Sequence, residues 1–219
     1  MNNKILKIGI LLTVLTIPAL VIVFLHSFGE NKFVIEVMNP QSAECKSNAV
    51  AGVHRIPAFS FVSQDGKTIT NQDFEEKIYV TDFFFTRCPD ICPTMTSELV
   101  RVQDAFKDRT DIKILSHSVD PLYDSVQILK EYAAKFNANP VIWTFVTGDK
   151  KEIYNMARCG YYISARENSS PLEVDFVHSD KVVLVDKEKR IRGYYSGTNR
   201  KEIDRLITEI QILLKEYEN

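Results

Sequence analysis

Two cysteines, Cys88 and Cys92, stand four positions apart in the segment "FFFTRCPDICPTM", and each is followed directly by a proline. Side chains four residues apart on a helical turn face the same way. The two sulfur atoms could therefore bind each other or one metal ion. As ligands, two thiolates are soft donors that suit Cu(I), with zinc as the main competitor. Because two donors make an incomplete site, we expect a third ligand elsewhere in the chain.

The third ligand is sought among the histidines. The chain contains His26, His54, His117 and His178. His26 ends an apolar segment, His54 precedes the predicted domain, and His117 lies inside a predicted strand, where we expect a structural role. His178 directly precedes a predicted hairpin. A lone histidine is more often structural than a ligand, so the role of His178 depends on where the fold places it.

Strand and helix patterns alternate along the chain. Short apolar segments rich in β-branched and aromatic residues are typical of buried strands, and apolar residues at helical spacing follow each of them. The predicted elements are, in order, a hairpin around Asp65-Gly66, strand 78–85, a helix from about Pro93, strand 112–119, a helix from a capping pair Asp124 and Gln127, strand 141–146, a helix from Asp149, a hairpin at 181–195 and a helix from Asn199.

This order predicts an α/β fold with mainly parallel central strands and a site beyond the carboxyl ends of those strands. Cys88 and Cys92 lie at such a place, which resembles the arrangement of a thioredoxin-like domain. We therefore expect an N-terminal hairpin and a central mixed sheet flanked by helices. In that fold the loop before the last hairpin faces the cysteine loop, which favours His178 as the third ligand. The helix dipole would favour thiolate, and either Pro89 or Pro93 can be the first helical residue.

The N-terminus contains an apolar run of 21 residues, Ile8–Phe28, and about 20 suffice for a helix that crosses a bilayer. We predict an uncleaved anchor, because the run exceeds a signal-peptide core and lacks a cleavage site. Lys4 and Lys7 place the N-terminus in the cytoplasm and the rest outside. No arginine precedes Arg55, which disfavours a mitochondrial transit peptide and favours a bacterial cytoplasmic membrane. The predicted division is an anchor at 1–30, a tether at 31–55 and a domain at 56–219.

The amino-acid composition and net charge limit the classes of function that are expected for this chain. The 219 residues are 45% hydrophobic and 26% charged, which is typical of a globular protein. A net charge of −2 gives no reason to expect nucleic acid as a partner. Outside the cytoplasm neighbouring cysteines tend to form disulfides, so a usable pair there needs a reductant or a metal.

The motifs "TRCPDICPTM", "SVDP" at 118–121, "TGD" at 147–149 and the late "VHS" occur in this order. Together they resemble the Sco/SenC family of membrane-anchored, thioredoxin-like copper proteins, from about Pro57 to Tyr195. The resemblance implies that Cys88, Cys92 and His178 bind copper, as Cu(I) or Cu(II). It also implies a metallochaperone, and not an enzyme in the strict sense, that delivers copper to the dinuclear copper centre of cytochrome c oxidase during assembly. The implied partner is the copper-receiving subunit of that oxidase.

The sequence departs from the family pattern near two of these residues. The family usually has an aspartate directly before the histidine, where this chain has Val177, with Asp175 two residues further back. Since a carboxylate of that kind orients a ligating imidazole, its loss is expected to change affinity or release. Before the first cysteine stands Arg87, which would favour a thiolate at Cys88. Neither change removes a ligand.

An alternative function is a thiol–disulfide oxidoreductase, in which Cys88 and Cys92 cycle between dithiol and disulfide and reduce a partner's cysteines. Three intervening residues, where thioredoxins have two, weaken this hypothesis, and a pure reductase has no need of His178. A peroxidase of related fold and a plain structural disulfide are weaker alternatives. For the other two cysteines we expect a buried thiol at Cys159 and a tether residue at Cys45, although a disulfide between them stays open.

Overall fold

The computed structural model describes residues 3–28, 34–42, 45, 49–50, 52–163 and 179–218, in two compact units, Met1–Val34 and Ile35–Asn219. The first unit contains the helix α1 (Asn3–Phe28), with Pro18 inside it. Its segment Lys7–Phe24 is long and apolar enough to cross a membrane, by length and composition.

The second unit carries the strands and the remaining helices. The strands are β1 (Ala49–Val50), β2 (Val53–His54), β3 (Ser60–Ser63), β4 (Thr68–Thr70), β5 (Ile78–Phe84), β6 (Ile112–Ser118), β7 (Trp143–Thr147), β8 (Lys181–Val185) and β9 (Ile191–Ser196). The helices are η1 (Asn71–Phe74), α2 (Ile91–Ala105), α3 (Val126–Lys135), α4 (Lys150–Asn155), the π-helical η2 (Met156–Gly160) and α5 (Arg200–Glu218).

A mixed sheet forms the centre of this unit, as predicted. Its strand order is β4-β3-β7-β6-β5-β8-β9. The neighbours β5, β6 and β7 are parallel, whereas β3, β4, β8 and β9 join by antiparallel pairing. Because β5 and β6 end together, at Phe84 and Ser118, the loops that follow them meet at one edge of the sheet.

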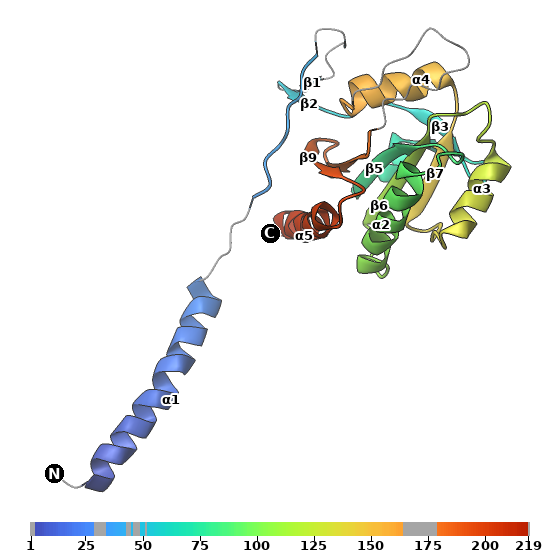
Figure 1. Cartoon of the computed structure of the whole chain (residues 1–219). Coiled ribbons are helices and arrows are strands. Elements are labelled where there is room, and N and C mark those ends of the chain that lie inside the picture. The colour runs from blue at the N-terminus through green and yellow to red at the C-terminus, as the bar shows by residue number, and fades with distance from the viewer. Residues whose placement is uncertain are drawn as a thin grey trace. The chain divides into compact units, whose positions relative to one another are not determined.

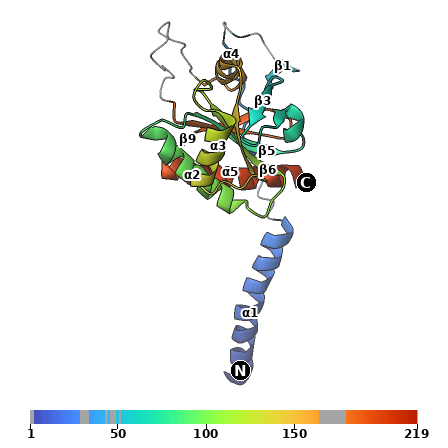
Figure 2. The same cartoon turned by 90° about the vertical axis from the view of Figure 1, so that its right-hand side faces the viewer.

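Each face of the sheet is covered by helices (Figures 1 and 2). Successive side chains of a strand point to opposite faces, so β5 sends Ile78, Val80 and Phe84 into one core and Tyr79 and Phe83 into the other. The first core packs against α2, α3 and α5, and the second against η1, α4 and η2. The strand before the cysteines is therefore buried on both sides, and its last residue is fixed in space.

Two predicted helix starts were wrong, and both corrections concern the site. Helix α2 begins at Ile91 with Asp90 as its N-cap, so neither Pro89 nor Pro93 is its first residue. The N-cap of α3 is Ser125, whose hydroxyl accepts a hydrogen bond from the Ile128 amide. Asp124 faces the cysteine loop instead, because the amide and the hydroxyl of Thr86 both donate to its carboxylate.

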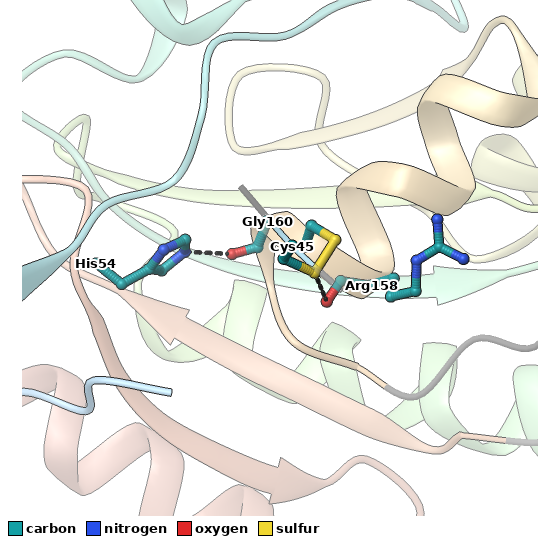
Figure 3. The surroundings of a disulfide bond; sticks show 5 residues. Cys45, His54, Arg158 and Gly160 are labelled. Carbon is teal, nitrogen blue, oxygen red and sulfur yellow. Dashed lines mark hydrogen bonds between the residues drawn. A yellow bond between two sulfur atoms is a disulfide. The ribbon is translucent and has the colours of Figure 1, made fainter. Parts of the chain in front are cut away.

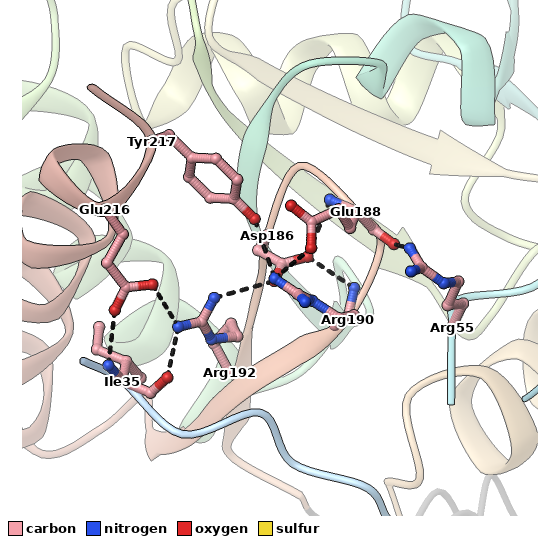
Figure 4. Close-up of polar contacts among 8 residues, drawn as sticks. All are labelled: Ile35, Arg55, Asp186, Glu188, Arg190, Arg192, Glu216 and Tyr217. Atoms are coloured by element: carbon pink, nitrogen blue, oxygen red, sulfur yellow. Dashed lines mark hydrogen bonds and ion pairs between the residues drawn. The ribbon is translucent and has the colours of Figure 1, made fainter. Parts of the chain in front are cut away.

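The segment after α1 is attached to the domain over part of its length. The Ile35 amide donates to the Glu216 carboxylate at 2.7 Å, and its carbonyl accepts from Arg192. Met38 forms an isolated antiparallel bridge with Ile191. Figure 4 shows the contacts of Ile35 with Glu216 and with Arg192. The segment that begins at Ile35 is bound to the buried Arg192, and the folded unit therefore starts at Ile35.

A disulfide joins Cys45 to Cys159, with 5.4 Å between the Cα atoms (Figure 3). Cys159 is buried as expected, but it is not a free thiol: the disulfide with Cys45 that the sequence left open is the one that forms. Nearby, His54 Nε2 lies 2.8 Å from the Gly160 carbonyl oxygen, and the His54 ring meets Tyr162 edge-on. These contacts fix the residues before β3 against η2.

Candidate metal centre

The two remaining cysteines are free thiols, both buried, with Cys88 6% and Cys92 5% exposed. Cys88 lies in the turn after β5, where its amide donates to the Phe85 carbonyl at 3.1 Å. Cys92 is the second residue of α2. The predicted position between a buried strand and the start of a helix is confirmed for Cys88, whereas Cys92, also expected before the helix, lies inside its first turn.

The two thiols have different surroundings. The Cys92 amide donates to Cys88 Sγ at 3.3 Å. An N–H at a helix N-terminus that points at sulfur favours negative charge on that atom. Burial raises the pKa of Cys92 well above its ordinary value, and the hydrogen bond with Cys88 acts in the same direction. For Cys92, burial therefore favours the neutral thiol, in the opposite direction to the thiolate that the sequence predicted.

Arg87 does not act on the cysteines alone. Its guanidinium pairs with the Asp120 carboxylate at 2.5 Å and lies over the Tyr123 ring, 4.2 Å from the centroid. The side chain is 53% exposed. The carboxylate offsets the charge that Arg87 would otherwise present to Cys88, so the expected electrostatic effect on Cys88 is reduced.

His178, Val177 and Asp175 lie outside the described residues. The first described residues after them are close to α2. Asp180 accepts hydrogen bonds from the hydroxyls of Ser196 and Thr198, and its carbonyl accepts from the Gly197 amide. A Cβ built on Gly197 would lie 2.6 Å from Met95 Cγ and 3.0 Å from the Asp180 carbonyl oxygen. Since Met95 follows Cys92 by three residues on α2, position 180 lies on the cysteine side of the sheet.

The other histidines of the domain have structural partners, as expected for His117. His117 Nδ1 lies 3.1 Å from Thr81 Oγ1, and its ring stacks on Phe83. Burial lowers the pKa of His117 to about 3. In the part of the chain that the structure describes, no three His, Cys, Asp or Glu side chains gather as a metal site, so Cys88 and Cys92 need a donor from elsewhere.

One buried residue near the site was missed from the sequence. Asp82, inside β5, is 1% exposed and accepts a hydrogen bond from Ser116, which accepts from Trp143 Nε1 at 2.9 Å. Burial raises the pKa of Asp82 to about 7, although the bond from Ser116 opposes the shift. The only signal was a carboxylate in the middle of an aromatic strand.

Asp82 and His117 should give folding stability opposite pH dependences. The folded state keeps a proton on Asp82 between its unfolded pKa of 3.8 and about 7, so this contribution is lost as the pH rises. The pKa of His117 falls from 6.5 to about 3 on folding, so that contribution is lost as the pH falls. When the pH rises from 5 to 7, the free energy of unfolding of Asp82→Asn should increase by about 2 kcal/mol relative to that of wild type. The free energy of unfolding of His117→Gln should decrease by about 2 kcal/mol relative to wild type over the same range. Urea unfolding at both pH values measures this, and parallel curves for wild type and Asp82→Asn would mean that Asp82 is ionised in the folded state.

The fold and the site define a thioredoxin-like domain with a paired-thiol site. A sequence model of the SCO1/SenC family matches residues 49–215, and the chain belongs to this family. The SCO1 protein homolog of Bacillus subtilis is 28% identical over 160 residues, which cover 72% of this chain and 82% of that protein.

Two solved structures are similar in fold. One is BsSco, described as a member of the Sco family of cytochrome c oxidase assembly proteins with a disulfide switch. It is 28% identical, with a TM-score of 0.63, over 72% of this chain and 91% of that one. The other is copper-bound ScoI of Arabidopsis thaliana, which is 28% identical, with a TM-score of 0.59, over 74% of this chain and 98% of that one.

Proposed function

We propose that this chain is a copper-binding protein of cytochrome c oxidase assembly, with Cys88, Cys92 and His178 as its ligands. The observation that carries the proposal is the state of the four cysteines. Cys45 and Cys159 form a disulfide, whereas Cys88 and Cys92 are free thiols at one helix N-terminus. A relative with copper bound, and a relative described as an oxidase assembly protein, support the same function.

The residues of the site suit a copper ion that is carried and then released. Two thiolates are soft donors, and an imidazole completes a three-donor set for copper. The Cys92 amide, 3.3 Å from Cys88 Sγ, stabilises a charged sulfur. The high pKa of Cys92 means that its proton must leave when copper binds and returns when copper is released. Delivery to the copper-receiving subunit of the oxidase would proceed by exchange of these ligands for those of the partner.

The proposed setting is a bacterial cytoplasmic membrane. The apolar segment of α1 would serve as the anchor, with the N-terminus inside and the domain outside. In this setting residues 1–30 are the proposed anchor, and the folded unit outside begins at Ile35 and not at residue 56. A thiol reductant is a required partner, because the free pair must stay reduced in an oxidising compartment.

Copper binding by the full-length chain in detergent tests the proposal. The protein is reduced without oxygen, loaded with copper and desalted, and copper per chain is measured for wild type, Cys88→Ser, Cys92→Ser and His178→Ala. We expect one tightly held copper in wild type, none in either serine variant, and affinity weakened at least about tenfold in His178→Ala. His54→Gln is the matched control, since His54 contacts the Gly160 carbonyl and should leave copper binding unchanged. Equal copper in wild type and Cys88→Ser would refute the proposal.

A second candidate function is reduction of disulfides in a partner. The contact between the Cys92 amide and Cys88 Sγ favours this function, because it makes Cys88 the better nucleophile, with the buried Cys92 as the second thiol. The reaction would form a Cys88–Cys92 disulfide and reduce one disulfide of the partner by two electrons. The variant His178→Ala separates the two functions. The rate of disulfide reduction should not change in this variant if the protein acts as a reductase, whereas copper binding should weaken if His178 is a ligand.

A further inference from the structure

A second loop supports the turn that carries Cys88. Residues 119–125 follow β6, and the Val119 amide donates to the Phe84 carbonyl at 2.8 Å, where β5 ends. At the other end of this loop stands Asp124, whose side chain is completely buried. The loop and the cysteine turn are therefore joined along their length.

The Asp124 carboxylate accepts three hydrogen bonds. The Thr86 amide donates to Oδ2 at 3.1 Å, the Thr86 hydroxyl donates to Oδ1, and the Ser118 hydroxyl donates to Oδ2 at 2.5 Å. Two of the three come from the residue two positions before Cys88. A buried carboxylate needs such donors to be stable away from water. The hydrogen bonds therefore hold Thr86 at a fixed position relative to Asp124.

The neighbouring ion pair is a weaker support. Arg87 and Asp120 also join the two loops, but the Arg87 side chain is 53% exposed. Exposed pairs contribute little, because water screens them. The contact that holds the cysteine turn is therefore the one between Thr86 and the completely buried Asp124.

We propose that Asp124 is a positioning residue for the cysteine site: through Thr86 it fixes the backbone before Cys88 and so the approach of the Cys88 sulfur to Cys92. This inference rests on the proposed function for its copper readout. Its second consequence, a shift in the equilibrium between the Cys88–Cys92 dithiol and its disulfide, does not involve copper. Both depend on the same geometry, because both require the two sulfur atoms at a set separation.

The test compares three variants of full-length protein with wild type. Thr86→Val removes the hydroxyl donor, Thr86→Ser retains it, and Asp124→Asn removes the charge with little change in shape. Thr81→Val is the matched control, because Thr81 is a buried threonine of β5 whose hydroxyl donates to the Leu115 carbonyl, on the strand that leads to Cys88. Urea unfolding of the metal-free proteins establishes that the two valine variants lose comparable stability.

Copper affinity is measured by competition with a chelator, together with the thiolate-to-Cu(II) absorption band. We expect Thr86→Val and Asp124→Asn to weaken copper binding about tenfold and to shift the band. Thr86→Ser and Thr81→Val should stay within about threefold of wild type, with an unshifted band. In parallel, equilibration with reduced and oxidised dithiothreitol gives the dithiol–disulfide constant, which should shift only in Thr86→Val and Asp124→Asn.

The two readouts separate the possible failures. If wild type holds no copper but the dithiol–disulfide constant shifts as expected, the proposed function fails and the positioning role stands. If Thr86→Val and Asp124→Asn match Thr81→Val in both measurements, Asp124 supports only folding and the inference is overturned.

Discussion

Replacing both Cys45 and Cys159 by serine is expected to lower the free energy of unfolding by about 3–5 kcal/mol. The disulfide joins residues separated by 114 positions, and a cross-link over so long a loop strongly restricts the unfolded chain. It also holds the segment before β1 against η2, beside the contact between His54 and Gly160. Urea unfolding without reductant measures the change.

The control for this experiment is the double variant Cys88→Ser/Cys92→Ser, in which the long-range disulfide remains. It should keep most of the stability, because serine is close in size to cysteine and no cross-link is lost. Wild type unfolded with dithiothreitol should behave like Cys45→Ser/Cys159→Ser. Equal stability of that variant and oxidised wild type would contradict the cross-link argument.

The variant Asp186→Ala should lower the free energy of unfolding by about 3–5 kcal/mol, because it removes one partner of a buried ion-pair network (Figure 4). Asp186 is completely buried. Its Oδ2 lies 2.7 Å from Arg190 Nε and 3.1 Å from Arg192 Nη1. Arg192 is itself 2% exposed as a side chain, so its charge would remain in the protein with one acceptor fewer. Thermal and urea unfolding measure the loss.

Two further variants test the reason for this loss. Glu188→Ala removes a carboxylate that pairs with Arg190 but is 38% exposed, and should change stability by less than about 1 kcal/mol. Asp186→Asn keeps an acceptor for the Glu188 and Arg190 amides in the turn. Its loss of stability should lie between those of Asp186→Ala and Glu188→Ala. If Asp186→Ala were no worse than Glu188→Ala, burial of the network would not control its contribution.

The order of the elements along the chain and the position of Cys88 after a buried strand were predictable from the sequence, because local patterns define the elements. Alternating apolar segments identified β5, β6 and β7, and a site after a parallel strand follows from the topology. Asp149 caps α4 as predicted, with the Glu152 amide donating to its side chain at 3.1 Å. Features of this kind depend on residues that are neighbours in the chain.

The features that were missed depend on residues far apart in the chain. Asp124 has the right type and spacing for a helix cap, yet its carboxylate accepts from Thr86, which is 38 positions earlier in the chain. Asp82 appeared as an ordinary strand residue, and its burial depends on Ser116 and Trp143 from two other strands. A single sequence contains no information on such pairs unless the fold is known. The ligand role of His178 stays a prediction.

The disulfide between Cys45 and Cys159 has a consequence for how the protein matures. Four cysteines can pair as two disulfides in three ways. In an unfolded chain exposed to oxidant, Cys88 and Cys92 meet far more often than Cys45 meets a residue 114 positions away. If the domain lies outside the cytoplasm, as proposed, oxidation would therefore close the short-range pair first. The final structure has one long-range disulfide and one free pair, so a reductant must reopen the short-range disulfide and spare the long-range one. The selectivity of that reductant would then determine the yield of active protein.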